Sequence, residues 1–407
     1  MAETKVPAGF DSTWLVKQQE HGVGREAFFN LLQGDFYRGT EWTDHQLQPG
    51  DLASSPWQVL PPGEYTALYQ LFSEHKGKPV GRLLVEDDGG RVLAEQVVVT
   101  AGQERDDWQR VLLGFSLKEA TRARVRFRYE GGTSIWTGAM HLTRGGRRPV
   151  YVIGHNRNTP EQVDRSLSLG ANAIEVDFSW RDGKIMAAEV PPLPGWTEIS
   201  ESQVWLSHVQ ALRDRWAFLY VDIKLSKVPD GNMYRYGQAL AEIFRTAGVD
   251  PKVCMFSVPD PSGKDVHRGL KESGFGASSY GMDGIDDNRP VHGKPGDWAA
   301  AAALHGLQFI GMGRISLEIQ KPLMLWWQVV EATAAARDFG KLPKKLVFWS
   351  LQEKGEMRKL LDLGVDGLIA DREDNLCAVL EEEPYRSFCR KALPGEWDPF
   401  HAFGVDG

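Results

Sequence analysis

The sequence predicts a (β/α)8 TIM barrel of the α/β class, preceded by an all-β sandwich domain. From Pro149 onward, short apolar runs alternate with helical stretches, and eight such βα units in about 260 residues have the size of a (β/α)8 barrel. Before that point, runs rich in Val, Leu, Phe and Tyr follow one another without helical stretches, which is typical of an antiparallel sandwich. The stretch "RGGRRP" at 144–149 is the expected linker, with "RGGRR" solvated, and it divides the chain into residues 1–146 and residues 147–407 with a C-terminal tail.

Each barrel strand is expected where a short apolar run ends in polar residues. The expected strands are 150–155, 173–178, 218–224, 253–258, 277–282, 307–312, 346–351 and 366–371. The expected helices are 160–170, 205–215, 234–248, 264–274, 296–306, 324–340, 354–364 and 375–383. Several of these helical stretches end in Gly, the residue that most readily adopts the left-handed conformation after a helix.

The N-terminal strands are expected at 63–72, 80–87, 91–100, 108–117, 123–131 and 134–143. The stretch "RARVRFRY" alternates strictly, so its four arginines are expected on a solvated face and its apolar residues on a buried face. This part of the chain resembles carbohydrate-binding β-sandwich modules joined to bacterial enzymes. Its tryptophans would either stack on a carbohydrate or fill the sandwich core, and these residues are Trp42, Trp57, Trp108 and Trp136. A further option is a purely structural domain that covers or completes the barrel mouth.

Composition sets limits on the partners and the compartment. The net charge of −8 gives no bulk attraction to nucleic acid. No apolar run of about 18 residues is present, so no transmembrane segment is expected. The first residues lack the pattern of a secretory signal, so a cytoplasmic protein is expected, or a secreted one if a signal has been removed. The three cysteines lack metal-binding spacing and suit a reducing compartment, with Cys254 expected in the core.

Charged side chains gather where the expected barrel strands end, which is where the active sites of such barrels lie. His155 ends the first strand, and Glu175 and Asp177 end the second with the spacing that points both side chains to one face. Asp222 and Lys224 repeat this spacing in the third strand. Three carboxylates at one mouth repel one another unless a cation holds them, and ligation by oxygen alone suits Mg²⁺ or Ca²⁺.

At these positions the sequence resembles a known superfamily. The motifs "GHN", "GANAIEVD", "VDIK", "FWS" and "LGVDGLIAD" look like those of the glycerophosphodiester phosphodiesterases, and most of all like their sphingomyelinase D, or phospholipase D toxin, branch. The resemblance runs from about Val150 to the C-terminus, where "PYRSFCRKALPGEWDPF" looks like the segment that plugs the barrel base in that branch.

The resemblance implies a role for each motif residue. Glu175, Asp177 and Asp222 would hold Mg²⁺, and His155 would be the first catalytic histidine, which attacks phosphorus. Lys224 would contact the phosphate, and Trp349 would face the substrate head group, where an aromatic ring can hold a quaternary ammonium. Gln352 and Asp371, at the ends of the seventh and eighth strands, are further candidates for substrate binding.

The chain departs from the family at the second catalytic histidine, which protonates the leaving group. The region reads "GKIMAAEVPPLPGW", with Glu189 or its neighbour at the expected place, and His208 lies in a helical stretch. The cysteine-bearing loop of the toxins is also absent. Three alternatives follow: Glu189 acts as the acid because its pKa is raised, the leaving group needs no proton, or catalysis is lost and binding is kept.

The leading expectation is a Mg²⁺-dependent enzyme that cleaves a phosphodiester as a phospholipase D does, acting on a small-molecule phosphate ester or a lipid. The first alternative is a Mg²⁺-dependent lyase or cyclase that ionises a diphosphate such as a prenyl diphosphate. This alternative requires an aromatic-lined apolar pocket without water. The second alternative is a non-catalytic protein that binds a phosphorylated or glycosylated ligand.

Overall fold

The computed structural model describes most of the barrel region and much of the preceding β region. The described residues are 12–14, 40–42, 50–54, 57–60, 62–102, 109–133, 135–144, 147–181, 183–189, 199–259, 263–283, 297–313, 330, 333, 343–383 and 385–397. Within them, no helix is long and apolar enough to cross a membrane.

Eight parallel strands close into a barrel, as the sequence predicts. In order around the barrel they are β11 (Arg148–Gly154), β12 (Ala173–Arg181), β15 (Leu219–Ile223), β16 (Cys254–Val258), β17 (Ser279–Asp283), β18 (Phe309–Gly313), β19 (Lys345–Leu351) and β20 (Gly367–Ala370). The barrel is closed because β11 pairs in parallel with both β12 and β20. A hairpin extends β12 through β13 (Lys184–Ala187) and β14 (Ser200–Glu201).

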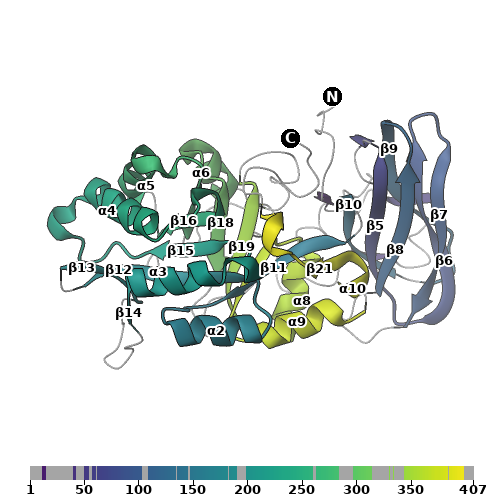
Figure 1. Cartoon of the computed structure of the whole chain (residues 1–407). Coiled ribbons are helices and arrows are strands. Elements are labelled where there is room, and N and C mark those ends of the chain that lie inside the picture. Colours follow the sequence, from purple (N-terminus) through teal and green to yellow (C-terminus); the bar gives the residue numbers. More distant parts are fainter. Residues whose placement is uncertain are drawn as a thin grey trace.

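Helices surround the barrel where helical stretches are predicted (Figure 1). They are α2 (Pro160–Ser168), α3 (Ser202–Ala211), α4 (Met233–Thr246), α5 (Lys264–Leu270), α6 (Asp297–His305), α8 (Lys354–Asp362) and α9 (Glu373–Glu381). Thr159 starts α2 with a capping box to Gln162. Gly170, Gly248 and Gly364 follow their helices with positive φ, as expected of C-terminal glycines. The helix predicted at 324–340 lies almost entirely outside the described residues.

Successive side chains of each barrel strand pack alternately into two different cores. One set, with Tyr220, Met255 and Phe309, forms a single cluster in the barrel interior. The alternate residues, such as Val221 and Phe256, pack outward against the helices. Glu175, Asp177 and Asp222 share the inward-facing parity, so the strand pattern itself directs these carboxylates into the barrel.

The C-terminal tail covers the end of the barrel where the strands begin. β21 (Cys389–Lys391) pairs in parallel with Arg148–Val150, and the ring of Trp397 lies 4.1 Å from that of Phe218. Arg148 is only 2% exposed and donates to the carbonyls of Leu361 and Val365. The expectation that "RGGRR" at 144–148 is a solvated linker is therefore wrong for Arg148, because its buried guanidinium donates to carbonyl groups at and just after the end of α8.

Before the barrel, the structure contains two antiparallel sheets with one shared core. The first is β1 (Ser12–Trp14), β10 (Ile135–Arg144), β5 (Gly63–Phe72) and β8 (Gln109–Leu117), with β2 (Thr40–Trp42) on β10. The second is β3 (Gly50–Ser54), β9 (Thr121–Tyr129), β6 (Lys76–Asp87) and β7 (Val92–Ala101), with β4 (Gln58–Leu60) on β9. Tyr69 of the first sheet stacks on Phe127 of the second with 4.7 Å between ring centroids.

Strand β9 alternates as predicted, with one exception among its arginines. Arg126 is 7% exposed rather than solvated, because it pairs with Glu86 at 2.6 Å. Trp57 lies under Arg124, 4.4 Å from the guanidinium carbon, and is not part of the sheet core. The side chains of Trp42, Trp108 and Trp136 lie outside the described residues.

A buried ion pair joins the sheets to the barrel, where β8 approaches α8 and α10 (Tyr385–Phe388) (Figure 1). Arg110 donates to both carboxylate oxygens of Asp362 at 3.0 and 2.6 Å and to the hydroxyl of Tyr385 at 2.6 Å. The side chains of Arg110 and Asp362 are 9% and 10% exposed. Leu68 of β5 belongs to the same apolar cluster as the residues of α8 and α9.

Candidate active site

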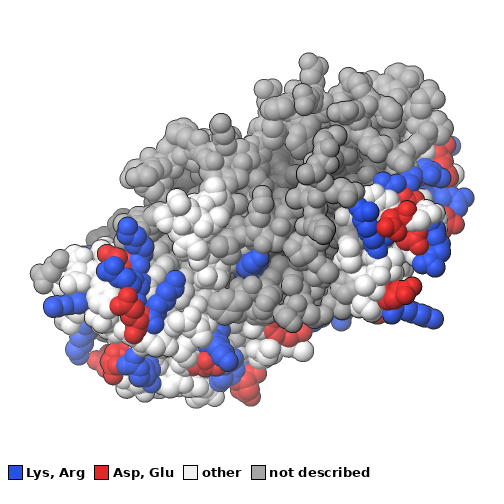
Figure 2. All heavy atoms as spheres, turned by 90° about the horizontal axis from the view of Figure 1, so that it is seen from above, with Lys and Arg blue, Asp and Glu red and all other residues white. Residues whose placement is uncertain are grey.

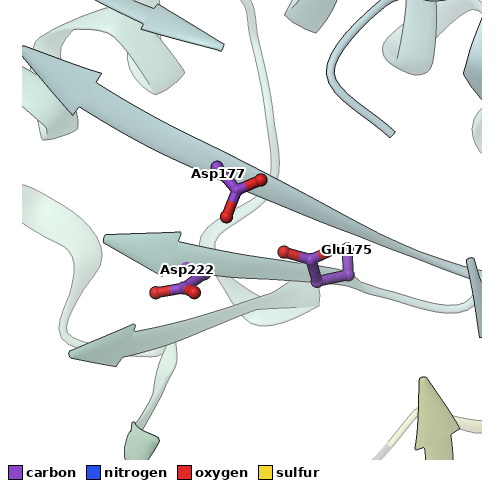
Figure 3. A group of neighbouring side chains, drawn as sticks. All are labelled: Glu175, Asp177 and Asp222. Atoms are coloured by element: carbon purple, nitrogen blue, oxygen red, sulfur yellow. The ribbon is translucent and has the colours of Figure 1, made fainter. Parts of the chain in front are cut away.

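Three carboxylates from the neighbouring strands β12 and β15 converge (Figure 3). Glu175, Asp177 and Asp222 each offer an oxygen, and these oxygens all lie within 4.8 Å of one another. Adjacent strands pair Asp177 directly with Asp222, so the register of the barrel fixes their separation. Glu175 and Asp177 are 4% and 1% exposed, so solvent screens their repulsion poorly.

The loop after β11 supports two of these carboxylates. The backbone N–H of Asn156 donates to Glu175. Asn158 is 2% exposed; its amide donates to Asp177 Oδ2 at 2.9 Å, and its carbonyl oxygen accepts from the Asp177 backbone N–H at 2.9 Å. Asn158 therefore fixes the orientation of Asp177. Asn158 was missed in the sequence, although its place in the loop after the first strand was a usable signal.

Lys224 is the positive charge beside the carboxylates. Its Nζ lies 2.7 Å from Asp222, 2.8 Å from Asp177 and 3.1 Å from Glu189. Although burial alone would lower the pKa of Lys224, the carboxylates around it hold the pKa well above its usual value. Lys224 therefore stays positively charged among the carboxyl groups of Asp222, Asp177 and Glu189. Glu175 is the fourth carboxyl group that its charge affects.

The carboxyl groups of the site have raised pKa values. Burial, together with the charges of Asp177 and Asp222, raises the pKa of Glu175 well above its usual value. Burial also raises the pKa of Asp222, against the effect of Lys224. Burial and the charge of Asp177 raise the pKa of Glu189 to about 7. One lysine thus leaves the cluster with surplus negative charge, and a set of buried oxygen donors fits a hard divalent cation.

His155 is held by a second group of residues at the neighbouring strand ends. Its Nδ1 lies 2.5 Å from Asp371 Oδ1, and the amide of Gln352 donates to the other oxygen of Asp371 at 3.0 Å. The hydrogen bond and charge of His155 lower the pKa of Asp371, although burial alone would raise it. Asp371 and Gln352, both expected to bind substrate, thus form a chain of hydrogen bonds that ends at the ring of His155.

A third group lies at the ends of β17 and β19. Asp283 accepts from the hydroxyl of Tyr220 at 2.6 Å and from the indole N–H of Trp349 at 3.0 Å. Burial and the charge of Asp222 raise the pKa of Asp283 to about 7. Gly311 permits this arrangement, because a Cβ there would lie 1.7 Å from Asp283 Oδ1. Asp283 was missed in the sequence, although it too is a carboxylate at a strand end.

The structure therefore brings together the predicted residues in neighbouring groups at one end of the barrel. Glu175, Asp177, Asp222, Lys224 and Glu189 form the carboxylate cluster. His155 is close enough for its charge to lower the pKa of Asp222. His208 lies on α3, where its Nε2 is 2.9 Å from Asp164, so it takes no part in this group. The stretch "PPLPGW" at 191–196 lies outside the described residues.

Comparisons with known proteins find matches to the part of the chain that contains these residues. The family profile described as "Dermonecrotic toxin SPH" matches residues 145–191, which contain His155, Glu175, Asp177 and Glu189. A "Dermonecrotic toxin SPH" from Ixodes scapularis is 27% identical over 276 residues, covering 60% of this chain and 74% of the relative. The chain fits the glycerophosphodiester phosphodiesterase superfamily near its sphingomyelinase D branch. "Dermonecrotic toxin Hl-PLD1" from Hemiscorpius lepturus is 24% identical, covering 58% of this chain and 80% of that relative.

A solved structure of a glycerophosphodiester phosphodiesterase from Parabacteroides distasonis is also similar to this chain. It is 13% identical, with a TM-score of 0.43, and the match covers 57% of this chain and 98% of the other. At that score the likeness adds nothing to the barrel described above.

Proposed function

We propose that the protein is a Mg²⁺-dependent phosphodiesterase that cleaves its substrate as a phospholipase D does. The observation that carries the proposal is the triad of buried Glu175, buried Asp177 and partly exposed Asp222 beside His155. Its surplus charge and all-oxygen donor set fit Mg²⁺. An ion held by these three residues would neutralise charge on the phosphate and so favour nucleophilic attack.

The remaining residues supply the chemistry of group transfer. Asp371 holds Nδ1 of His155, which leaves Nε2 to attack phosphorus and form a phosphorus–nitrogen bond as the bond to the leaving alcohol breaks. Lys224 would contact a phosphate oxygen. In the second step, water or a hydroxyl of the substrate itself attacks phosphorus and releases His155. Water gives a phosphate monoester, whereas the internal hydroxyl gives a cyclic phosphate.

Glu189 is proposed as the acid in place of the family's second histidine. Burial raises the pKa of Glu189, so its carboxyl group is suited to hold a proton and give it to the leaving alcohol. Its carboxylate then accepts the proton of the attacking water or hydroxyl, so one residue serves both steps. Its Oε2 lies 3.1 Å from Lys224, which places the carboxyl group beside the proposed phosphate position.

Trp349 and Asp283 favour a substrate with a cationic head group. The indole ring is partly exposed at the end of β19, and its N–H bonds to the buried carboxylate of Asp283. An aromatic face attracts a quaternary ammonium, and Asp283 adds to this attraction in its ionised form. A choline-bearing phosphodiester such as lysophosphatidylcholine or sphingomyelin therefore fits better than an uncharged head group.

The other candidate functions receive less support. A lyase that ionises a prenyl diphosphate needs an aromatic-lined apolar pocket, whereas the described residues around the triad are mainly charged or polar. Carbohydrate stacking on Trp57 is disfavoured because Arg124 covers its ring. We further propose that residues 1–146 form a sandwich domain with a structural role, anchored through Arg110, and that residues 147–407 form the catalytic domain.

The test is ³¹P NMR of wild-type protein with lysophosphatidylcholine, in Mg²⁺ and in EDTA. The expected result is a new monoester or cyclic phosphate signal that EDTA abolishes. Asp222→Asn should remove the signal, whereas Asp250→Asn, outside the barrel mouth, should keep it. Turnover that persists equally in EDTA would refute the metal-dependent mechanism. Release of diphosphate from a prenyl diphosphate, without phosphodiester cleavage, would favour the lyase instead.

A further inference from the structure

A second charge pair lies next to the hydrogen bond between His155 and Asp371. Because β11 and β20 are paired in parallel, His155 and Asp371 directly follow neighbouring strands in the same register. Two residues further along the same two loops stand Arg157 and Glu373, and Arg157 Nη2 lies 2.7 Å from Glu373 Oε1. The loops after β11 and β20 are thus joined by two pairs of side chains in step with each other.

The carboxylate of this second pair is fully buried. The side chain of Glu373 is 0% exposed and that of Arg157 is 17% exposed. Glu373 Oε1 accepts from Nε and Nη2 of Arg157 at 3.2 and 2.7 Å, and also from the hydroxyl of Ser166 on α2. Gly154 permits this close packing, because a Cβ there would lie 3.0 Å from Glu373 Oε1 and 1.9 Å from Ser166 Oγ.

Ion pairs on the molecular surface are a different case. In the view from above, basic and acidic side chains stand beside one another at both ends of the molecule, open to solvent (Figure 2). Such exposed pairs contribute little, because solvent screens them. In the pair of Arg157 and Glu373 the carboxylate is shielded from solvent, so loss of its charge changes the field that acts on the guanidinium.

The loop itself is anchored without this ion pair. The backbone N–H of Arg157 donates to the carbonyl of Glu175 at 3.0 Å, and the carbonyl of Arg157 accepts from the indole N–H of Trp205 at 2.7 Å. Both bonds use only backbone atoms of Arg157, so another side chain at this position leaves them in place. The ion pair therefore serves to place the charge of Arg157 rather than to hold the loop.

Asp371 is the other carboxylate on which this charge acts. Burial alone would raise the pKa of Asp371, and besides His155 the positive charge of Arg157 helps to lower it. Both oxygens of Asp371 are in use, one by His155 Nδ1 and the other by the amide of Gln352. A guanidinium released from Glu373 would therefore compete with His155 for Asp371.

We propose that Glu373 is a positioning residue of the phosphodiesterase site, which acts by keeping the guanidinium of Arg157 away from Asp371. Asp371 then remains available to hold Nδ1 of His155. This role rests on the proposed function, because it affects turnover only if His155 acts in catalysis. It follows that the charge of Glu373 matters only while Arg157 is present.

The kinetic test is steady-state cleavage of lysophosphatidylcholine in Mg²⁺. Glu373→Gln should lower kcat about tenfold with little change in KM, as expected when a hydrogen bond to a charged group is lost. The double variant Arg157→Gln/Glu373→Gln should recover to within about threefold of wild type, because the competing guanidinium is gone. Adding Glu373→Gln to Asp371→Asn should cause no further loss. Glu381→Gln, at the exposed end of α9, is the matched control and should behave as wild type.

The decisive test does not require turnover. Proton NMR of the full chain at low temperature shows a histidine ring N–H that is hydrogen-bonded to a carboxylate as a far-downfield signal. The signal missing from His155→Gln belongs to His155. It should be present in wild type, absent from Asp371→Asn and from Glu373→Gln, and present again in Arg157→Gln/Glu373→Gln.

Recovery of the His155 signal in the double variant supports the positioning role, because a defect in packing alone would persist or worsen when the second side chain is changed. The proposal is wrong if Glu373→Gln keeps the signal, or if the double variant lacks it as the single variant does. A wild-type protein without phosphodiesterase activity would refute the proposed function, whereas the NMR comparison would still decide whether Glu373 protects the bond between His155 and Asp371.

Discussion

Asp371→Asn tests how strongly the orientation of His155 contributes to catalysis. The substitution keeps the size of the side chain and an oxygen that can accept from Gln352, but removes the charge 2.5 Å from His155 Nδ1. A hydrogen bond to a charged group contributes about 1.5–3 kcal/mol. Because the two side chains are 29% and 34% exposed, solvent screening favours the lower part of this range, about 1.5–2 kcal/mol. The expected loss in kcat is therefore about 10- to 30-fold.

The assay is steady-state cleavage of lysophosphatidylcholine in saturating Mg²⁺. KM and the thermal midpoint should change little, because Asp371 acts through His155 rather than on substrate. Asp374→Asn is the matched control, since Asp374 pairs with Arg372 on the surface of α9, and its kcat should stay within about twofold of wild type. An unchanged kcat in Asp371→Asn would refute the positioning role, as would a loss in kcat that merely follows a loss of stability.

Three further predictions concern the hydrogen bonds of Asn158, the ion pair of Arg110 and the raised pKa values of the site. Asn158→Ala should weaken Mg²⁺ binding about 10- to 100-fold by calorimetric titration, because Asp177 loses its support; unchanged affinity would contradict this. Arg110→Ala should lower the free energy of unfolding in urea by about 3–5 kcal/mol, because Asp362 is left buried and unpaired, whereas Arg122→Ala should cost below about 1 kcal/mol. In EDTA, the thermal midpoint should fall between about pH 5 and pH 8 and recover with Mg²⁺; a midpoint that rises over this range would refute the electrostatic account.

The sign of the pH prediction comes from the raised pKa values of the site. Glu189 and Asp283, with pKa values of about 7, keep protons in the folded state that an unfolded chain has already released, so stability falls as pH rises toward 7. Glu175 and Asp222 act in the same direction. His267 opposes them, because the unfolded chain binds a proton there that the fold does not. The effect of this one histidine is smaller than the combined effect of the four carboxyl groups, so the thermal midpoint should still fall as the pH rises. In Glu189→Gln the thermal midpoint should fall by less than in wild type.

The barrel could be predicted because its strands leave a strong signal in the sequence. A strand buried on both faces reads as a short apolar run, and the glycines after the helices mark where each helical stretch ends. The start of β6 was missed, since "KGKP" at 76–79 carries no apolar pattern. Arg148 was assigned to a solvated linker because composition alone does not reveal which carbonyl groups a guanidinium will meet.

The candidate site was predictable to the extent that it follows from strand ends. The spacing of Glu175 and Asp177 predicted that both side chains point to one face of their strand. Asp222 and Lys224 repeat this spacing in the next barrel strand, which placed them at the same site. Asn158 was missed because its importance comes from two hydrogen bonds across the loop, which only the fold creates. Likewise, the pKa of Glu189 depends on burial and on the distance to Asp177, and neither quantity can be read from the sequence.

The measurement that tests the central claim most directly is anomalous diffraction from a crystal soaked in Mn²⁺, which substitutes for Mg²⁺. One strong peak is expected at the barrel mouth, about 2.0–2.3 Å from oxygens of Glu175, Asp177 and Asp222. The peak should disappear in an Asp222→Asn crystal. A triad without a peak in the wild-type crystal, or an ion held elsewhere in the barrel mouth, would contradict the metal site and the mechanism built on it.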